Sequence, residues 1–320
     1  MSAQADLKIQ PQVLDFTPYS PGLSIQDIRS RYGLERVIKL SSNENPHGLS
    51  PLVQRCIEKA AGLGFRYPRA GSPDLTRALA EFYSLSPDRF VVSNGSDEAI
   101  DLLIRVLLRP GKDHLLVCDP CFSMYHLQAK LCGVSVVQVP LNPDFSFPWE
   151  RLLAQVDETT GLVFITSPDN PSGYTAFKNE ILTFAEKLPA SCFLVVDEAY
   201  IEFADAPEQC SPLRDLKAWS RQNCIILRTF SKMYGLAGLR VGYAIMPPEI
   251  REYLLRVKSP FSVNLLAEQA AIAALKDQDF ARLTIETVHQ GKTYLTRELI
   301  RLSCSVFPSQ ANFLMFKPPI

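Results

Sequence analysis

One lysine stands between two segments of very different character. Lys232 follows the apolar run 224–231 and precedes the glycine-containing segment 235–242, in which Arg240 comes eight residues after the lysine. A lysine that is held at the end of a buried strand, close to a second cation, has a lowered pKa. Its amine can then act as a nucleophile or a base near neutral pH. The setting favours a reactive lysine over a solvated surface lysine.

Two carboxylates follow another apolar run. Asp197 and Glu198 come directly after residues 192–196, which are apolar without interruption. Burying a carboxylate is costly unless it meets a cation or a hydrogen-bond donor. The pattern therefore predicts either a salt bridge to an arginine of the chain or a partner on a bound ligand.

Two further polar segments also follow apolar runs. Residues 94–97, Asn-Gly-Ser-Asp, open a helical pattern whose free backbone N–H groups could hold a phosphate, although an ordinary helix cap has the same composition. The segment "SPDNPSG" (167–173) fixes a turn that projects Asn170, and taken alone it indicates a turn only.

These residues are positioned by short apolar runs that alternate with helical patterns. Most of the runs are continuous rather than alternating, which is typical of strands covered on both faces. The sequence predicts an α/β fold in which a mainly parallel, mixed seven-stranded sheet is sandwiched by helices. The predicted strands are 89–93, 114–118, 134–141, 162–167, 192–200, 224–231 and 240–246.

The character of the chain changes after about residue 258. Two helical segments, 265–277 and 280–302, follow, and then one strand-like piece at 306–317. We therefore expect three regions. They are an N-terminal arm that contributes to a smaller α+β domain (1–40), a large domain (41–258), and a C-terminal small domain (259–320).

Composition limits the classes of partner. The chain has 320 residues, 47% hydrophobic content and a net charge of −1, with acidic and basic residues mixed along it. Nothing indicates a nucleic-acid surface, a membrane span or the apolar core of a signal peptide. Cys118 and Cys121 have C-x-x-C spacing, but no second Cys or His pair follows at ligand spacing. We expect reduced thiols in a cytoplasmic protein without a metal site.

The unusual polar residues all fall at strand ends. In open α/β sheets, ligands collect outside the carboxyl ends of the strands. An amine, a carboxylate, an amide, an arginine and a helix N-terminus in one place match the needs of pyridoxal 5'-phosphate. Its phosphate requires N–H groups, hydroxyls and an arginine, its aldehyde requires an amine, and its ring nitrogen requires a carboxylate.

Several motifs extend this prediction over essentially the whole chain. The first three are "TPYSPG" (17–22), "IKLSSNENPHGLSP" (38–51) and "YPRAGSPDLTRALA" (67–80). They are followed in order by "SNGSDEAIDLL", "DPCFSMY", "SPDNPSG", "VVDEAYIEF" and "RTFSKMYGLAGLRVGY". With these motifs the chain resembles the fold-type I pyridoxal-phosphate aminotransferases, class II, and within them the histidinol-phosphate aminotransferase branch.

The resemblance implies a role for each matching residue that meets the cofactor. Lys232 would bond to the cofactor aldehyde and then move a proton, and Asp197 would pair with the ring nitrogen. The ring oxygen would be bound by Tyr200 and Asn170, and Tyr125 would stack on the ring. The phosphate cradle would consist of Ser96, Asp97, Thr229, Ser231 and Arg240.

The resemblance also implies a second subunit and a substrate side. Tyr67 would reach the cofactor phosphate of the neighbouring subunit, so a homodimer with shared active sites is expected. Tyr19 and Asn43 would face the substrate, with Tyr19 on a segment that closes over it.

The implied reaction is amino-group exchange between L-histidinol phosphate and 2-oxoglutarate in histidine biosynthesis. Three alternatives remain open at this point. They are an aromatic amino-acid aminotransferase, a threonine-phosphate decarboxylase of the same fold family, and a catalytically silent protein that binds pyridoxal phosphate. The family continues past the position of Ile320 with substrate-binding arginines, and we expect this chain to be part of a longer enzyme.

Overall fold

The protein divides into two compact units. The structure, a computed structural model, describes residues 8–14, 16, 22–217 and 223–319. The units are Met1–Glu44 and Asn45–Ile320. The described part of the first unit holds α1 (Pro11–Leu14) and α2 (Ile25–Tyr32). Tyr19, expected on the substrate side, lies outside the described residues.

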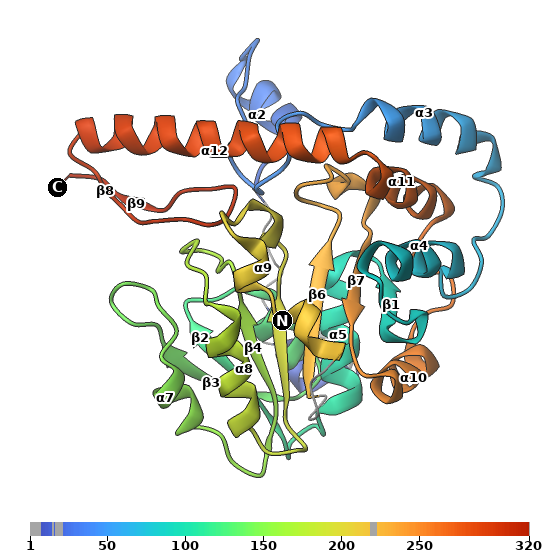
Figure 1. The fold of residues 1–320 in the computed structure, drawn as a ribbon, viewed down its shortest axis with the longest axis vertical. Coiled ribbons are helices and arrows are strands. Elements are labelled where there is room, and N and C mark those ends of the chain that lie inside the picture. The colour runs from blue at the N-terminus through green and yellow to red at the C-terminus, as the bar shows by residue number, and fades with distance from the viewer. Residues whose placement is uncertain (1–7, 15, 17–21, 218–222, 320) are drawn as a thin grey trace, which may run out of the picture. The chain divides into compact units, whose positions relative to one another are not determined.

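The second unit is built on a seven-stranded sheet, as predicted (Figure 1). Its order is β1-β7-β6-β5-β4-β2-β3. Every pair is parallel except the two that β7 makes, with β1 and with β6. The strands are β1 (Phe90–Ser93), β2 (His114–Asp119), β3 (Ser135–Pro140), β4 (Thr160–Thr166), β5 (Phe193–Asp197), β6 (Cys224–Thr229) and β7 (Gly242–Ile245).

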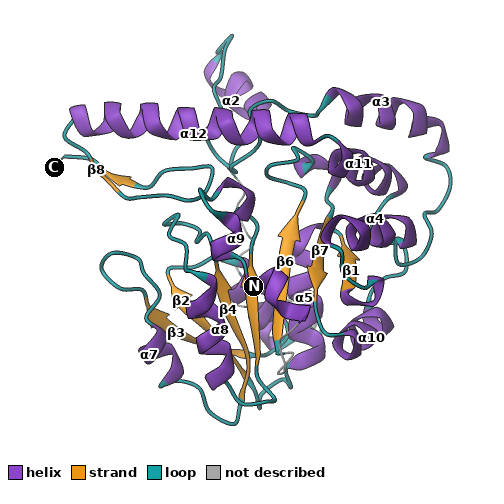
Figure 2. Cartoon of the chain, viewed as in Figure 1, coloured by secondary structure: helices purple, strands orange, loops and turns teal. Residues whose placement is uncertain are grey.

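Helices cover both faces of the sheet, and this explains the continuous apolar runs (Figure 2). On β5, Leu194 and Val196 join one core cluster, whereas Val195 between them joins the other. The first cluster includes residues of α3 (Pro51–Ala60), α4 (Pro73–Tyr83), α8 (Lys178–Lys187) and α11 (Leu265–Lys276). The second includes residues of α5 (Gly95–Leu107), α6 (Met124–Leu131) and α10 (Pro248–Val257).

Short elements connect these layers. The remaining α-helices up to the C-terminal region are α7 (Trp149–Leu153) and α9 (Pro207–Cys210). The 3₁₀ turns are η1 (Ala61–Leu63), η2 (Pro87–Arg89), η3 (Ile201–Phe203), η4 (Pro212–Lys217) and η5 (Ala237–Leu239).

The C-terminal region differs from the prediction in one respect. The long helix α12 (Gln278–Arg301) forms as expected, but residues 306–317 are not one strand (Figure 1). They form most of a hairpin in which β8 (Ser305–Val306) pairs with β9 (Phe316–Lys317). Pro308 lies between the two strands, and proline cannot donate to a strand ladder. A separate small domain from residue 259 stays a prediction.

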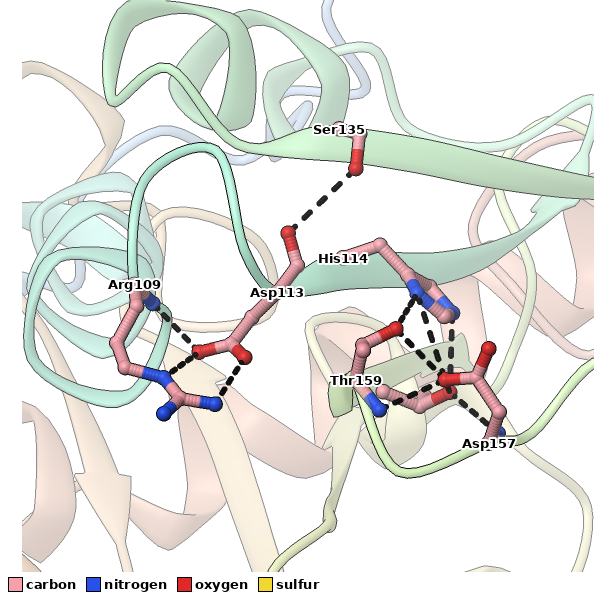
Figure 3. Close-up of polar contacts among 7 residues, drawn as sticks. Arg109, Asp113, His114, Ser135, Asp157 and Thr159 are labelled. Carbon is pink, nitrogen blue, oxygen red and sulfur yellow. Dashed lines mark hydrogen bonds and ion pairs between the residues drawn. The ribbon is translucent and has the colours of Figure 1, made fainter.

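The edge of the sheet that holds the amino ends of its parallel strands is closed by polar side chains (Figure 3). Arg109 donates to both carboxylate oxygens of Asp113, at 2.9 and 2.7 Å, and lowers the pKa of that carboxyl to about 2. His114, at the start of β2, is buried and hydrogen-bonded to the hydroxyls of Thr159 and Thr160 at 3.0 and 2.9 Å. This cluster satisfies the buried strand ends opposite the site described next.

The described residues hold neither a helix that could cross a membrane nor a cluster of side chains that could bind a metal ion. Over residues 8–14, 16, 22–217 and 223–319, no helix is long and apolar enough to cross a membrane. Within the same ranges no group of three or more His, Cys, Asp or Glu side chains could hold a metal ion. All eight cysteines are free thiols.

Candidate active site

One edge of the sheet collects the predicted polar residues because of the direction of the strands. The carboxyl ends of β1, β4, β5 and β6 meet there. Since β7 runs the other way, its first residue, Gly242, pairs with Ser93 and Thr229, the last residues of β1 and β6. Arg240, two residues earlier, therefore reaches the same edge. Neither the lysine nor the arginine needs a long loop to arrive.

A pocket lies at this edge, and nine of the predicted residues line it. These are Ser96, Asp97, Asn170, Asp197, Tyr200, Thr229, Ser231, Lys232 and Arg240. Three lining residues were not predicted from the sequence: Phe122, Thr166 and Ala199. Thr166 and Ala199 carried no signal, because an isolated threonine or alanine beside a strand end is common.

One wall of the pocket is an arginine clamp. Arg240 donates to Ser231 Oγ at 3.3 Å and to Asp97 Oδ2 at 3.1 Å. The backbone N–H of Ser231 donates to Thr229 Oγ1 at 3.1 Å, which ties the end of β6 to the same wall. Burial raises the pKa of Asp97, while Arg240 and Lys232 oppose that rise.

Two glycines let the backbone approach this wall. Gly95 has a φ of +69°, and a Cβ built on it would lie 2.5 Å from Nη2 of Arg240. A Cβ on Gly242 would lie 2.8 Å from the backbone nitrogen of Ser96. The Cβ on Gly242 would collide with fixed backbone, so that position requires glycine, whereas a Cβ on Gly95 would push the Arg240 guanidinium away. The space that they leave lies at the first turn of α5.

The start of α5 presents backbone donors. Asn94 is the N-cap, but its side chain makes no capping bond and donates instead to the carbonyl of Ser262 at 2.7 Å. Ser262 Oγ in turn donates to Glu98 at 2.9 Å and accepts from Lys258 at 2.5 Å. The N-cap side chain leaves the first-turn N–H groups uncapped, and such groups favour a bound anion.

The two carboxylates at the end of β5 have different partners. Glu198 takes the salt bridge that the sequence left open, because Arg228 donates to it at 2.9 and 2.7 Å. Asp197 instead accepts from Tyr125 Oη at 2.9 Å and from the backbone N–H of Ala199 at 3.0 Å. It is 2% exposed, and its burial raises its pKa to about 6. A cationic donor in the pocket would reverse that rise.

The amine and the phenol lie between these walls. The Nζ of Lys232 is 5.4 Å from the ring centre of Tyr200. Asn170 Nδ2 lies 3.4 Å from the Tyr200 hydroxyl, close enough for a weak hydrogen bond. The amide and the phenol can therefore act on one acceptor atom beside the lysine.

Tyr125 is placed differently from the expected stacking position. It is fully buried, does not line the pocket, and uses its hydroxyl on Asp197 and on Thr166. The aromatic ring that lines the pocket is Phe122, from the same "DPCFSMY" motif. The motif predicted an aromatic residue beside the cofactor ring. It contains two aromatic residues, and the sequence alone does not say which of them faces the pocket.

Besides Tyr125, three further predicted residues are not among those that line the pocket. Tyr67 is 82% exposed and stacks on Phe261 with ring centres 5.0 Å apart. Asn43 belongs to the first unit and has a φ of +52°. Tyr19 lies outside the described residues. Their predicted roles stay predictions.

The donors of the pocket fit pyridoxal phosphate. A phosphate would find the first turn of α5, two hydroxyls and Arg240 at one end. A protonated ring nitrogen would find Asp197, a buried carboxylate without an ion-pair partner among the described residues, at the other end. The amine of Lys232 lies in the same pocket. Because Gly95 and Gly242 have no Cβ, a narrow space remains beside them, and it suits a phosphate that is held by backbone N–H groups.

Comparison with known proteins agrees with this geometry. Residues 35–319 match the family model described as aminotransferase class I and II. The histidinol-phosphate aminotransferase of Nitratidesulfovibrio vulgaris strain DP4 is 51% identical over 311 residues, which are 97% of this chain and 83% of that relative. The enzyme of the same name from Oleidesulfovibrio alaskensis is 50% identical over 99% of this chain and 82% of its own length.

Solved structures show the same fold. The crystal structure of histidinol-phosphate aminotransferase from Sinorhizobium meliloti in complex with pyridoxal-5'-phosphate superposes with a TM-score of 0.89. It is 28% identical, and the match covers 98% of this chain and 83% of that one. Aspartate aminotransferase from Thermus thermophilus with maleate, 24% identical, shares the fold with a TM-score of 0.79 over 91% of this chain and 79% of its own.

Proposed function

The chain belongs to the class I and II aminotransferase family and, within it, to the histidinol-phosphate aminotransferases, and from this we propose its reaction and the roles of its residues. The cofactor is pyridoxal 5'-phosphate. The reaction transfers the amino group of L-histidinol phosphate to 2-oxoglutarate, giving imidazole acetol phosphate and glutamate, in histidine biosynthesis. The observation that carries this is the identity of about half of all residues over 97% of the chain, with Lys232 and Asp197 in one pocket.

The cofactor, when bound, supplies an electron sink for the substrate carbon that must lose a proton. The residues of the chain bind and orient the reactants and move the proton. Lys232 would hold the cofactor through its amine and would serve as the base that takes the proton from the substrate carbon. Its position shortly after the end of β6 places Lys232 in the lining of the pocket.

Asp197 holds the proton on the ring nitrogen, because a buried carboxylate beside a cationic N–H is stabilised in its charged form. Tyr200 and Asn170 donate to the ring oxygen. Arg240, Ser231, Thr229 and the first turn of α5, with Ser96 and Asp97, hold the phosphate. Phe122, and not Tyr125, is the aromatic ring that we assign to the face of the cofactor.

The finer parts of the proposal concern assembly and substrate. We assign Tyr67 to the cofactor phosphate of a second copy of the chain in a homodimer, which agrees with its 82% exposure. Asn43 and Tyr19 are assigned to the substrate side. The protein works in the cytoplasm, and its other partners are small molecules only.

The test is a transamination assay with purified protein, pyridoxal phosphate, histidinol phosphate and 2-oxoglutarate, read as glutamate formed. Glutamate formation supports the reaction. Transfer from phenylalanine but not from histidinol phosphate would contradict the substrate. Release of CO₂ from threonine phosphate without transfer would contradict the reaction type.

Lys232→Ala tests the assignment of the amine. We expect the variant to show no absorption band beyond that of free pyridoxal phosphate and to form no glutamate, because no covalent bond to the cofactor can form. The matched control is Lys59→Ala, which removes an exposed lysine of α3. If such a band and the activity survive in Lys232→Ala, the lysine is misassigned.

A further inference from the structure

A fully buried tyrosine outside the pocket touches the carboxylate inside it. Tyr125 has no exposed surface, and its Oη lies 2.9 Å from Oδ2 of Asp197. The other carboxylate oxygen, Oδ1, accepts the backbone N–H of Ala199 at 3.0 Å. Each oxygen of the carboxylate thus has one fixed donor from the protein, and the plane of the carboxylate is set by the two together.

The direction of the tyrosine's single proton follows from its neighbours. The Oη of Tyr125 also lies 2.7 Å from Oγ1 of Thr166. An ionised carboxylate can only accept, whereas a hydroxyl can donate or accept. The Tyr125 proton therefore goes to Asp197, and the Thr166 hydroxyl donates to Tyr125. The chain of donors starts at Thr166, on the strand beside Asp197 in the sheet.

The ring of Tyr125 cannot turn away from this contact. It packs on Phe164 with ring centres 4.5 Å apart and meets the edge of Phe122 at 5.7 Å. Phe122 is the ring that lines the pocket, so the aromatic wall and the tyrosine brace one another. A hydroxyl held by packing loses little entropy when it binds, which makes it an effective positioning group.

We propose that Tyr125 is a positioning residue for the reaction, whose hydroxyl, oriented by Thr166, holds the Asp197 carboxylate ionised and in the plane where the cofactor ring nitrogen meets it. The inference rests on the proposed function for its cofactor only, and it does not depend on which amino donor is used. Tyr125 itself touches neither cofactor nor substrate. This role replaces the stacking role expected from the sequence.

The consequence is a defined pattern of losses. Without the Tyr125 hydroxyl, the carboxylate loses a donor that favours its charged form, so its bond to a protonated ring nitrogen weakens. Affinity for pyridoxal phosphate and kcat should both fall by about tenfold or more, which is the scale of losing one hydrogen bond to a charged group. The KM for the amino donor should stay within about twofold, because the substrate is not touched.

The experiment is a double-mutant cycle on the dissociation constant of pyridoxal phosphate, which is measured by titrating the apoprotein. The variants are Tyr125→Phe, Asp197→Ala and the pair. We expect Tyr125→Phe to weaken binding about tenfold or more in the native background and less than about twofold in the Asp197→Ala background, where no carboxylate remains to be held. An equal loss in both backgrounds, or no loss in either, would overturn the proposal.

A control separates this from a general packing effect. Tyr243 is also fully buried, and its hydroxyl lies 2.6 Å from that of Tyr83, away from the pocket. Tyr243→Phe should leave the affinity for pyridoxal phosphate and kcat unchanged, and an equal loss there would make Tyr125 merely structural. Kinetics are measured with whichever amino donor the protein accepts, so failure with histidinol phosphate would count against the proposed substrate and leave this test intact.

Discussion

Arg228 binds Glu198 inside the core, and each of them has a neighbour in the chain that lines the pocket. The guanidinium donates to Oε2 of Glu198 at 2.9 and 2.7 Å, and both side chains are nearly excluded from water, at 10% and 1% exposure. Thr229 follows Arg228, and Asp197 precedes Glu198. Because successive residues of a strand point to opposite faces, the ion pair lies behind the strand ends that line the pocket.

The first prediction is that breaking this pair destabilises the fold. Arg228→Met leaves Glu198 as a buried, uncompensated charge, and such a loss costs about 3–5 kcal/mol. Unfolding in urea, measured by far-UV circular dichroism, gives the difference in free energy of unfolding. The matched control is Arg105→Met, which removes an exposed arginine from its pair with Asp101 and should cost less than about 1 kcal/mol. Equal costs for the two variants would mean that water reaches the Arg228 pair.

The same pair shows what could be predicted from the sequence. The apolar run 192–196 predicted that Asp197 and Glu198 are buried carboxylates at a strand end, and the structure confirms this. Which of the two would take an arginine could not be read, because the arginine comes from β6, and only the register that pairs Asp197 with Leu227 sets the partners. Long-range register is a property of the folded sheet rather than of either segment.

The fold itself was predictable because its signals are local. The seven apolar runs correspond to the seven strands. The helical pattern that residues 94–97 open corresponds to α5, in which Ile100, Leu103 and Ile104 are fully buried. The hairpin β8–β9 was missed because two strands of two residues have no measurable period. The choice between Phe122 and Tyr125 was missed because sequence spacing does not say which aromatic ring of a motif points into a pocket.

The second prediction concerns the close approach at the phosphate end of the pocket. Gly95→Ala places a methyl group 2.5 Å from Nη2 of Arg240, so the guanidinium must move away from the first turn of α5. We expect the affinity for pyridoxal phosphate to fall by at least about tenfold, the scale of losing one charge-assisted hydrogen bond. Equilibrium titration of the apoprotein measures it.

Backbone strain must be separated from this collision. Gly111 has a φ of +68°, nearly the same as Gly95, but a Cβ there meets no atom within 4 Å. Gly111→Ala should therefore share the cost in stability, about 1–2 kcal/mol for a left-handed non-glycine residue, and leave cofactor affinity unchanged. If both variants bind the cofactor equally well, Arg240 does not depend on the space at Gly95.

The third prediction is a pH dependence. Burial raises the pKa of Glu202 to about 7. The positive charge of Arg228 acts in the opposite direction, but this arginine also pairs with Glu198. The folded state therefore holds this proton at pH values where the unfolded state, with an ordinary pKa of 4.5, has lost it. The contribution of Glu202 to stability is present below about pH 4.5 and is lost as pH rises towards 7, by up to about 1.4 kcal/mol per pH unit.

Glu202→Gln removes this contribution because glutamine does not titrate. The free energy of unfolding of the variant, relative to the native protein, should rise between about pH 4.5 and 7 and level off above that range. Urea unfolding at a series of pH values from 5 to 8 measures the difference. Glu186→Gln, which removes an exposed carboxyl of α8, is the control. A difference that does not change with pH for Glu202→Gln would show that its carboxyl is not held protonated in the fold.

The last prediction tests whether two copies of the chain share their active sites. Tyr67 is 82% exposed and lies outside the residues that line its own pocket, so a role at the phosphate of a neighbouring subunit accounts for its position. Tyr67→Ala should then weaken cofactor binding, and Lys232→Ala should abolish activity.

If each site uses Lys232 of one subunit and Tyr67 of the other, a hybrid dimer of these variants has one site with both defects and one site with neither. Mixing the two inactive or weakened variants, with exchange of subunits, should therefore raise activity above that of either alone at low pyridoxal phosphate. Tyr253→Ala, which removes an exposed tyrosine of α10, is the control and should behave as native protein before mixing. If mixing restores nothing although hybrid dimers are present, each site is complete within one chain and Tyr67 has another role.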